Sequence, residues 1–279
     1  MPSQSLTWVD GKATERLPLP DRGLDFGDGL FETLLLRRGK PAYAEQHWER
    51  LSHGLAALAL PDCVAVVRDQ LQAVSEAVEA KDWTWASLRV TVTRGSAPRG
   101  YRPPRVSQPR IIMSASELGR DATQLCSPAT LCSSSVRMAP QSRLAGVKHL
   151  NRLEQVLAAG DAARAEVDEA IMLDQRDHLV AVSSGNLFLR LGGSLLTPPL
   201  HECGIVGTRR ELVLNRWGPA LGLVVTEAEI GIDELFDADE VFYSNALVGL
   251  RPVERFEQRN WTDHSTCEAL FKRYLDELC

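Results

Sequence analysis

The spacing of apolar residues predicts two helices in the first half of the chain. Within residues 45–60 the apolar side chains recur every three or four positions, which places them on one helical face: Trp48, Leu51, Leu55 and Leu58. This helix must end before Pro61, because proline removes an amide donor and cannot continue a helix. Residues 64–80 have the same apolar period and predict a second helix.

Strands and hairpins are predicted on both sides of these helices. Asp10 and Gly11 separate two short strand-like stretches, and this dipeptide accepts the positive φ angles of a tight hairpin. A second hairpin is expected to turn at residues 38–40. The stretches SLRVTVTRG and PRIIMSAS are rich in β-forming residues, and the loop between them is rich in proline and arginine.

Strand patterns dominate the second half of the chain. We expect a helix just after residue 148, then strands at EAIMLD, HLVAVSS, NLFLRLGG and SLLTPP, a helix at residues 208–221 and a late strand at EVFYSN. Polar residues after PRIIMSAS mark a boundary between domains 1–118 and 119–279. Neither half alternates strand and helix regularly, so this mixed α/β (α+β) chain is not expected to form a doubly wound sheet.

Length, composition and charge exclude several classes of protein. The chain has 279 residues, enough for two domains, and its 44% hydrophobic and 24% charged residues are ordinary for a globular protein. No apolar run approaches the roughly 18 residues of a membrane-spanning helix, and the net charge of −6 argues against a nucleic-acid partner. The first residues have no signal-peptide pattern, so we expect a cytoplasmic protein.

Several common site signatures are missing from the sequence. The six cysteines and six histidines have no metal-binding spacing, so no metal is expected. There is no glycine-rich dinucleotide fingerprint, no Walker phosphate loop and no G-x-S-x-G nucleophile motif. Sites that depend on these signatures are therefore not indicated.

The stretch GIVGTRREL can be read in two ways. Gly204 and Gly207 precede a predicted helix, and Thr208 with Glu211 has the spacing of a capping box, which would simply begin the helix well. Free amides and the dipole at a helix N-terminus also bind anions, and the arginines at 209 and 210 add positive charge. The stretch is therefore a candidate phosphate site.

Lys148 stands before the predicted helix that begins in GVKHLNRLEQ. Most lysines are solvated surface charges. At a helix N-terminus, however, the dipole opposes an ammonium group, and burial also favours the neutral amine that attacks carbonyls. A reactive lysine together with a phosphate site indicates pyridoxal phosphate.

Seven motifs, taken together and in order, resemble those of the fold-type IV pyridoxal-phosphate enzymes. They are DRGLDFGDGLFET, HWERL, RGSAPRGY, GVKHLNRLEQVLAA, SSGNLF, GIVGTRR and FYSNAL, and the similarity extends from about residue 5 to residue 253. Within this branched-chain and D-amino-acid aminotransferase-like family, the chain is most similar to the aminodeoxychorismate lyases. The resemblance implies a homodimer with a small N-terminal domain, a larger C-terminal domain that carries the lysine, and the cofactor in the interdomain cleft.

The resemblance also implies roles for individual residues. Lys148 matches the lysine that holds the cofactor covalently and later moves a proton. The residues that match the family's phosphate contacts are Arg50, Gly207, Thr208, Arg209 and Asn245. In the loop RGSAPRGY, which is closer to the lyases than to the aminotransferases, Arg99 and Tyr101 are the candidates for binding a substrate that carries carboxylates.

The activity implied is conversion of 4-amino-4-deoxychorismate to 4-aminobenzoate and pyruvate, a step of folate biosynthesis. A D-amino-acid or branched-chain aminotransferase is the alternative enzyme, because those enzymes share the same cofactor residues.

One position departs from the family pattern. A glutamate that binds the pyridine nitrogen of the cofactor normally stands five residues before the asparagine of the N-L-F motif, and here that position is Ala181. Asp174 and Asp177 are the nearest upstream acids. A cofactor-binding protein with weakened catalysis is therefore a further alternative.

Overall fold

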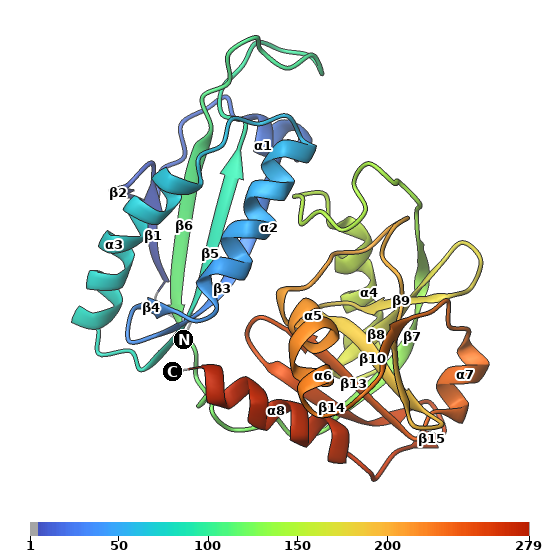
Figure 1. Cartoon of the computed structure of the whole chain (residues 1–279). Coiled ribbons are helices and arrows are strands. Elements are labelled where there is room, and N and C mark those ends of the chain that lie inside the picture. Colours follow the sequence, from blue (N-terminus) through green and yellow to red (C-terminus); the bar gives the residue numbers. More distant parts are fainter. Residues whose placement is uncertain (1–4, 279) are drawn as a thin grey trace. The chain divides into compact units, whose positions relative to one another are not determined.

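The computed structural model describes residues 5–278 and divides by its contacts into two units (Figure 1). The N-terminal unit comprises residues 5–121 together with Val147–Asn151, and the C-terminal unit comprises Ala122–Gly146 and residues 152–278. The main break therefore falls three residues after the boundary expected from sequence. The chain therefore returns to the N-terminal unit at Val147 and leaves it again after Asn151.

The N-terminal unit is an antiparallel sheet with two long helices on one face. Its strands are β1 (Ser5–Val9), β2 (Lys12–Ala13), β3 (Gly29–Arg37), β4 (Lys40–Pro41), β5 (Trp85–Thr93) and β6 (Arg110–Glu117), in the order β2-β1-β6-β5-β3-β4. Its helices are α1 (Arg22–Phe26), α2 (Ala44–Ala57) and α3 (Val64–Ala80). Both predicted hairpins are confirmed, since β1 pairs with β2 and β3 pairs with β4 in antiparallel fashion.

Apolar side chains from α2, α3 and one face of the sheet form the core of this unit. Leu30, Leu34 and Leu88 of the sheet pack in one cluster with Leu51 of α2 and Val74 of α3. Helix α3 has the predicted bounds. Helix α2 ends at Ala57, earlier than expected, because Ala59 adopts a positive φ of 49° and the chain turns before the proline.

The outer edge of β3 is completed by the distant segment Val147–Asn151. The amide of Phe31 donates to the carbonyl of Lys148 (3.0 Å), and the amide of Leu150 donates to the carbonyl of Gly29 (3.0 Å). Residues 148–150 therefore lie beside β3 as a short strand would.

The C-terminal unit is a nine-stranded sheet that curls around its own core (Figure 1). Its strands are β7 (Ala129–Met138), β8 (Glu169–Asp174), β9 (Leu179–Val182), β10 (Asn186–Leu191), β11 (Ser194–Thr197), β12 (Val225–Glu227), β13 (Glu240–Asn245), β14 (Gly249–Phe256) and β15 (Arg259–Asn260). The order is β12-β11-β10-β13-β14-β7-β8-β9, with β15 paired to β14. Its helices are α4 (Leu153–Arg164), α5 (Thr208–Leu212), the π-helical turn η1 (Val213–Trp217), α6 (Gly218–Ala220), α7 (Ile232–Asp237) and α8 (Ser265–Glu277).

Two helix starts differ from expectation. Helix α4 begins at Leu153 with Arg152 as its N-cap, so Lys148 is not at its N-terminus. Helix α5 begins at Thr208 with Gly207 as its N-cap, so Thr208 is not the capping residue. The expected helix over residues 208–221 is otherwise present, since α5, η1 and α6 follow one another without a break to Ala220.

Among the described helices, none has the length and apolar composition that crossing a membrane demands.

Candidate active site

Arg50 is held in a buried ion pair in the N-terminal unit. Its Nε and Nη2 donate to the two oxygens of Glu32 at 2.8 and 2.6 Å, and Nδ1 of His47 lies 2.7 Å from Glu32 Oε2. Glu32 points from β3 towards α2, which carries both basic residues. Burial raises the pKa of Glu32, but the charge and hydrogen bonds of Arg50, with those of His47, outweigh it and lower the pKa to about 2.

This arrangement fixes the Arg50 guanidinium at a defined position. The Arg50 side chain is 12% exposed, whereas Glu32 and His47 are almost fully buried. Two parallel hydrogen bonds to one carboxylate set the plane of a guanidinium as well as its place. Sequence reasoning missed Glu32 and His47, although an acid inside an apolar strand is itself a signal, because a buried carboxylate needs a partner.

Lys148 lies in the extended segment beside β3. Its Nζ is 4.1 Å from the centroid of the Phe31 ring, and the guanidinium carbon of Arg89 is 4.0 Å from the same centroid. The argument from a helix dipole is wrong, because the lysine lies five residues before α4. Its surroundings are instead an aromatic ring and the strand β3. The resemblance placed this lysine in the C-terminal domain. In the structure, its contacts are instead with the N-terminal unit.

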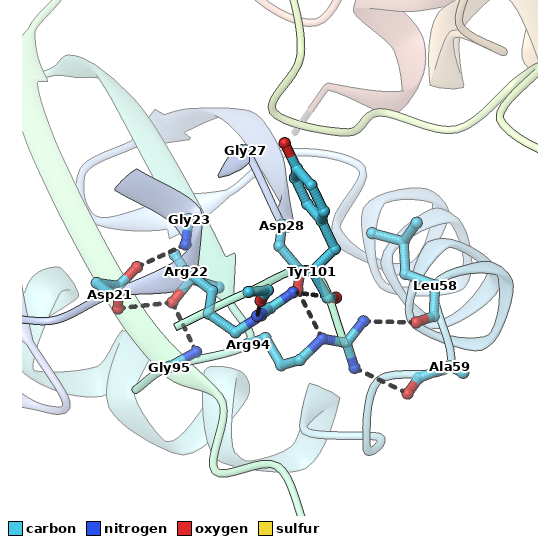
Figure 2. Close-up of polar contacts among 12 residues, drawn as sticks. Asp21, Arg22, Gly23, Gly27, Asp28, Leu58, Ala59, Arg94, Gly95 and Tyr101 are labelled. Atoms are coloured by element: carbon cyan, nitrogen blue, oxygen red, sulfur yellow. Dashed lines mark hydrogen bonds and ion pairs between the residues drawn. The ribbon is translucent and has the colours of Figure 1, made fainter. Parts of the chain in front are cut away.

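Arg99 and Tyr101 lie on the loop between β5 and β6. Both are exposed, Tyr101 by 85%. The Tyr101 ring centroid is 5.3 Å from that of Phe26, at the end of α1. Figure 2 shows this tyrosine above a cluster of arginine and aspartate side chains in the same unit.

In the C-terminal unit, α5 begins with an N-terminus that no side chain caps. The first bond of the helix runs from the amide of Glu211 to the carbonyl of Gly207 (3.0 Å), so the preceding amides have no carbonyl one turn earlier within the helix. Thr208 and Arg209 are buried, and Arg209 Nη1 donates to Thr208 Oγ1 (3.2 Å). Glu211 does not complete the expected capping box, because its carboxylate accepts from Arg210 (3.1 Å).

Arg210 is buried and is bound by other groups of the C-terminal unit. Its side chain is 2% exposed, and its Nη2 donates to the carbonyl of Pro198 (2.9 Å) and to Glu227. Of the two arginines that the sequence offered as positive charges for an anion, this one is already paired with Glu211 and Glu227.

Asn186 supports the backbone that leads into α5, and Asn245 supports the turn after β13. A Cβ on Gly207 would lie 2.0 Å from Asn186 Oδ1, so only glycine allows this close approach. Asn186 Nδ2 also donates to the carbonyl of Ile205 (2.9 Å). Asn245 Oδ1 accepts from the amides of Leu247 and Val248, at 3.0 and 2.9 Å. The side-chain carbonyl of Asn245 is thus engaged with the turn after β13.

The two acids upstream of Ala181 are engaged elsewhere. Burial raises the pKa of Asp174, but the amides of His178 and Arg176 outweigh it and the pKa is lowered. Asp177 is 72% exposed and pairs with Arg137. The acid beside the loop after β9 is Glu169, which the sequence reasoning missed. It accepts from the hydroxyls of Ser183 and Ser184 and from the Ser184 amide (3.1 Å).

Comparisons with known proteins identify the family. The model of the family "Amino-transferase class IV" matches residues 29–256. An aminodeoxychorismate lyase of Vibrio harveyi is 32% identical over 251 residues, which cover 88% of this chain and 89% of the relative. A putative branched-chain-amino-acid aminotransferase of Methanocaldococcus jannaschii is 30% identical over 86% of this chain and 82% of its own.

A solved structure extends this similarity to three dimensions. The crystal structure of 4-amino-4-deoxychorismate lyase from Pseudomonas aeruginosa matches with a TM-score of 0.88 and 37% identity, over 98% of this chain and 99% of that one. The expected mixed α/β architecture of fold type IV is therefore confirmed. From the family match and these similarities, the chain belongs to the class IV aminotransferase family.

Proposed function

We propose that this chain is a pyridoxal-phosphate-dependent aminodeoxychorismate lyase, which converts 4-amino-4-deoxychorismate to 4-aminobenzoate and pyruvate. The observation that carries the proposal is the 37% identity to the lyase from Pseudomonas aeruginosa over nearly the whole of both chains. The lyase of Vibrio harveyi supports it with 32% identity. The further expectations of a cytoplasmic homodimer that supplies folate biosynthesis stay predictions.

Pyridoxal 5′-phosphate is the cofactor of this family, and the described residues fit its phosphate group. The uncapped first turn of α5 offers amides, and the buried Thr208 and Arg209 add a hydroxyl and a positive charge. Gly207 lets the side chain of Asn186 lie against the backbone at the start of this helix. The match of HWERL to the family motif makes Arg50, whose guanidinium Glu32 orients, a further candidate for phosphate binding.

The proposed roles of the side chains follow from their chemistry. When bound, the cofactor withdraws electrons from the substrate carbon that carries the amine. Lys148 Nζ would hold the cofactor and would accept the ring proton of that same carbon when the substrate is bound. Arg99 and Tyr101 bind the substrate carboxylates. The enolpyruvyl group then leaves and takes up a proton to become pyruvate.

Ala181 is compatible with a lyase for a physical reason. A transaminase must hold a full carbanion, so it needs a strongly electron-withdrawing pyridine ring. Loss of the ring proton and the enolpyruvyl group makes the product aromatic, so the developing charge leaves through the substrate itself. An aminotransferase is the second candidate, favoured by the 30% identity to the Methanocaldococcus jannaschii protein.

The direct test is to load the purified chain with pyridoxal phosphate and follow the appearance of 4-aminobenzoate from 4-amino-4-deoxychorismate. We expect measurable release of 4-aminobenzoate and pyruvate in equal amounts. A loaded protein that transaminates D-alanine or a branched-chain amino acid but releases no 4-aminobenzoate would establish the second candidate instead. A loaded protein with neither activity would be a cofactor-binding protein with weakened catalysis.

A further inference from the structure

Arg22, at the start of α1, makes two of its side-chain hydrogen bonds to a loop almost 80 residues away in the sequence. Its side chain is 5% exposed. Nη1 donates to the carbonyl of Gly100 (2.8 Å), and Nη2 donates to the carbonyl of Tyr101 (2.9 Å). Its third nitrogen, Nε, donates to Asp28 Oδ2 (2.7 Å). Figure 2 shows the three bonds fanning out from one guanidinium.

Asp28 links Arg22 to Arg94 and, through Arg94, to the end of α2. The same carboxylate oxygen accepts from Arg94 Nε (2.8 Å), and the remaining nitrogens of Arg94 donate to the carbonyls of Leu58 (2.8 Å) and Ala59 (3.1 Å). Two arginines therefore share one carboxylate. One of them holds the end of α2, and the other holds the loop (Figure 2).

The loop has little else to hold it. Across residues 97–108, the part of the chain that the structure describes shows hydrogen bonds to Arg22 and no others. The one ring contact there is that of Tyr101 with Phe26, and the guanidinium carbon of Arg22 lies 4.8 Å from the centroid of the same Phe26 ring. Arg22 thus supports Tyr101 twice, through its carbonyl and through the ring on which it packs.

We propose that Arg22 is a positioning residue that holds residues 99–101 in the conformation that presents Arg99 and Tyr101 to the substrate carboxylates. The inference rests on the proposed function for the roles of Arg99 and Tyr101, whereas the anchoring itself does not. A guanidinium suits this task because its donors lie on three nitrogens in one rigid plane, whereas an ammonium group has all its donors on a single nitrogen at the end of a flexible stem.

The anchoring is tested by limited trypsin digestion of the cofactor-loaded protein. Arg99 and Arg105 are exposed cleavage sites in the loop, whereas Arg102 is followed by proline. Arg22→Lys keeps the charge beside Asp28 and loses the fork. We expect it to raise the cleavage rate of the loop at least about tenfold, the effect of one lost hydrogen bond to a charged group.

Arg94→Lys is the matched control, because Arg94 shares Asp28 and also donates to two backbone carbonyls. We expect it to lower the melting temperature without accelerating cleavage of the loop. Equal acceleration in both variants, or none in Arg22→Lys, would overturn the anchoring. If Arg22→Lys does not fold, the trypsin cleavage rates of the unaltered protein decide: cleavage after Arg99 as fast as cleavage after Arg105 overturns the anchoring, and slower cleavage after Arg99 supports it.

The link to substrate is tested by kinetics. Arg22→Lys should raise KM for 4-amino-4-deoxychorismate at least about tenfold, with kcat and cofactor content close to those of the unaltered protein. In an Arg99→Ala background the same change should add much less, because both act through one loop. Faster cleavage with an unchanged KM would support the anchoring and overturn the substrate-presenting role. If the unaltered protein forms no 4-aminobenzoate, the proposed function itself fails.

Discussion

Glu32 shows how one buried acid can fix the position of a basic side chain. It stands in GLFETLLLR, among apolar and threonine side chains of β3, and takes both hydrogen bonds from Arg50. The motif match predicted Arg50 from the sequence, but the residue that orients it could not be assigned, because the pairing of β3 with α2 is a tertiary contact. An acid in an apolar strand therefore predicts a basic partner nearby in the fold.

The lowered pKa of Glu32 predicts how stability depends on pH. A group whose folded pKa lies below its unfolded value stabilises the fold above the unfolded pKa, and this contribution is lost as pH falls through the folded pKa. With a folded pKa of about 2, Glu32 should contribute about 3 kcal/mol that disappears between roughly pH 4.5 and pH 2. Urea unfolding at several pH values should show a flatter profile for Glu32→Gln. Asp177→Asn, which removes a 72% exposed acid, is the control and should follow the unaltered protein.

Lys148 carries a prediction about covalent attachment. The other lysines, Lys12, Lys40, Lys81 and Lys272, are all exposed, whereas Lys148 is partly buried beside Phe31. We expect borohydride reduction of the loaded protein, followed by peptide mapping, to place the pyridoxyl group on Lys148. A pyridoxyl group on any of the exposed lysines would contradict the assignment.

Elements with local signals were predictable, and those that depend on distant pairing were not. The hairpin at Asp10 and Gly11, the second hairpin and helix α3 follow from turn chemistry and apolar period. Strand β7, ATLCSSSVRM, was missed because serines fill positions where strands usually carry β-branched or aromatic residues. Its parallel pairings with β8 and β14 leave no local signature.

The proposed phosphate contacts and the proposed substrate contacts predict different effects of substitution. Thr208→Ala and Arg50→Lys should each weaken cofactor binding about tenfold, because they remove charge-assisted or hydroxyl contacts to a phosphate. Arg50→Lys keeps a charge beside Glu32 and should therefore stay folded. Arg99→Ala should instead raise the substrate KM and leave cofactor content unchanged, as measured by titration with pyridoxal phosphate. Thr226→Ala, in β12, is the control for Thr208. Equal cofactor loss in all the variants would refute this division.

Ala181 in β9 carries a prediction about reaction choice. Ala181→Glu restores the acid that the family places there, and we expect it to gain transamination of D-alanine or branched-chain amino acids by about tenfold or more. Ala181→Gln has the same size and cannot supply the negative charge, so it should show no gain. Coupled assays of keto-acid formation measure both. If the unaltered protein transaminates as fast as it releases 4-aminobenzoate, another acid serves the pyridine nitrogen.

At the scale of the whole molecule, the motifs predicted the family and the fold class, but not where the lysine packs. The pattern of apolar residues placed Lys148 with the helix that follows it, whereas hydrogen bonds to Gly29 and Phe31 hold the segment beside β3. Such a contact between positions more than 100 residues apart is not visible in any local window of sequence.

Hydrogen exchange should reveal this long-range pairing. The amides of Phe31 and Leu150 donate to carbonyls of Lys148 and Gly29, so they should be protected in the native protein and should lose protection together. The exposed Tyr101 provides an unprotected reference. Independent loss of protection at the two amides would show that the segment opens from β3 on its own.

The same pairing has a consequence for the order in which the chain is made. Phe31 leaves the ribosome 117 residues before Lys148, which at about 5–20 residues per second is a delay of roughly 6–23 s. The last strand of the N-terminal unit, β6, is complete at Glu117, so over the next 31 residues the unit has all its strands but an unfilled edge on β3. The lysine is therefore added last to a sheet that is otherwise complete. With Lys148 as the proposed attachment point, a nascent chain could not hold the cofactor covalently until this short segment has emerged, at which time most of the C-terminal unit is still to be made.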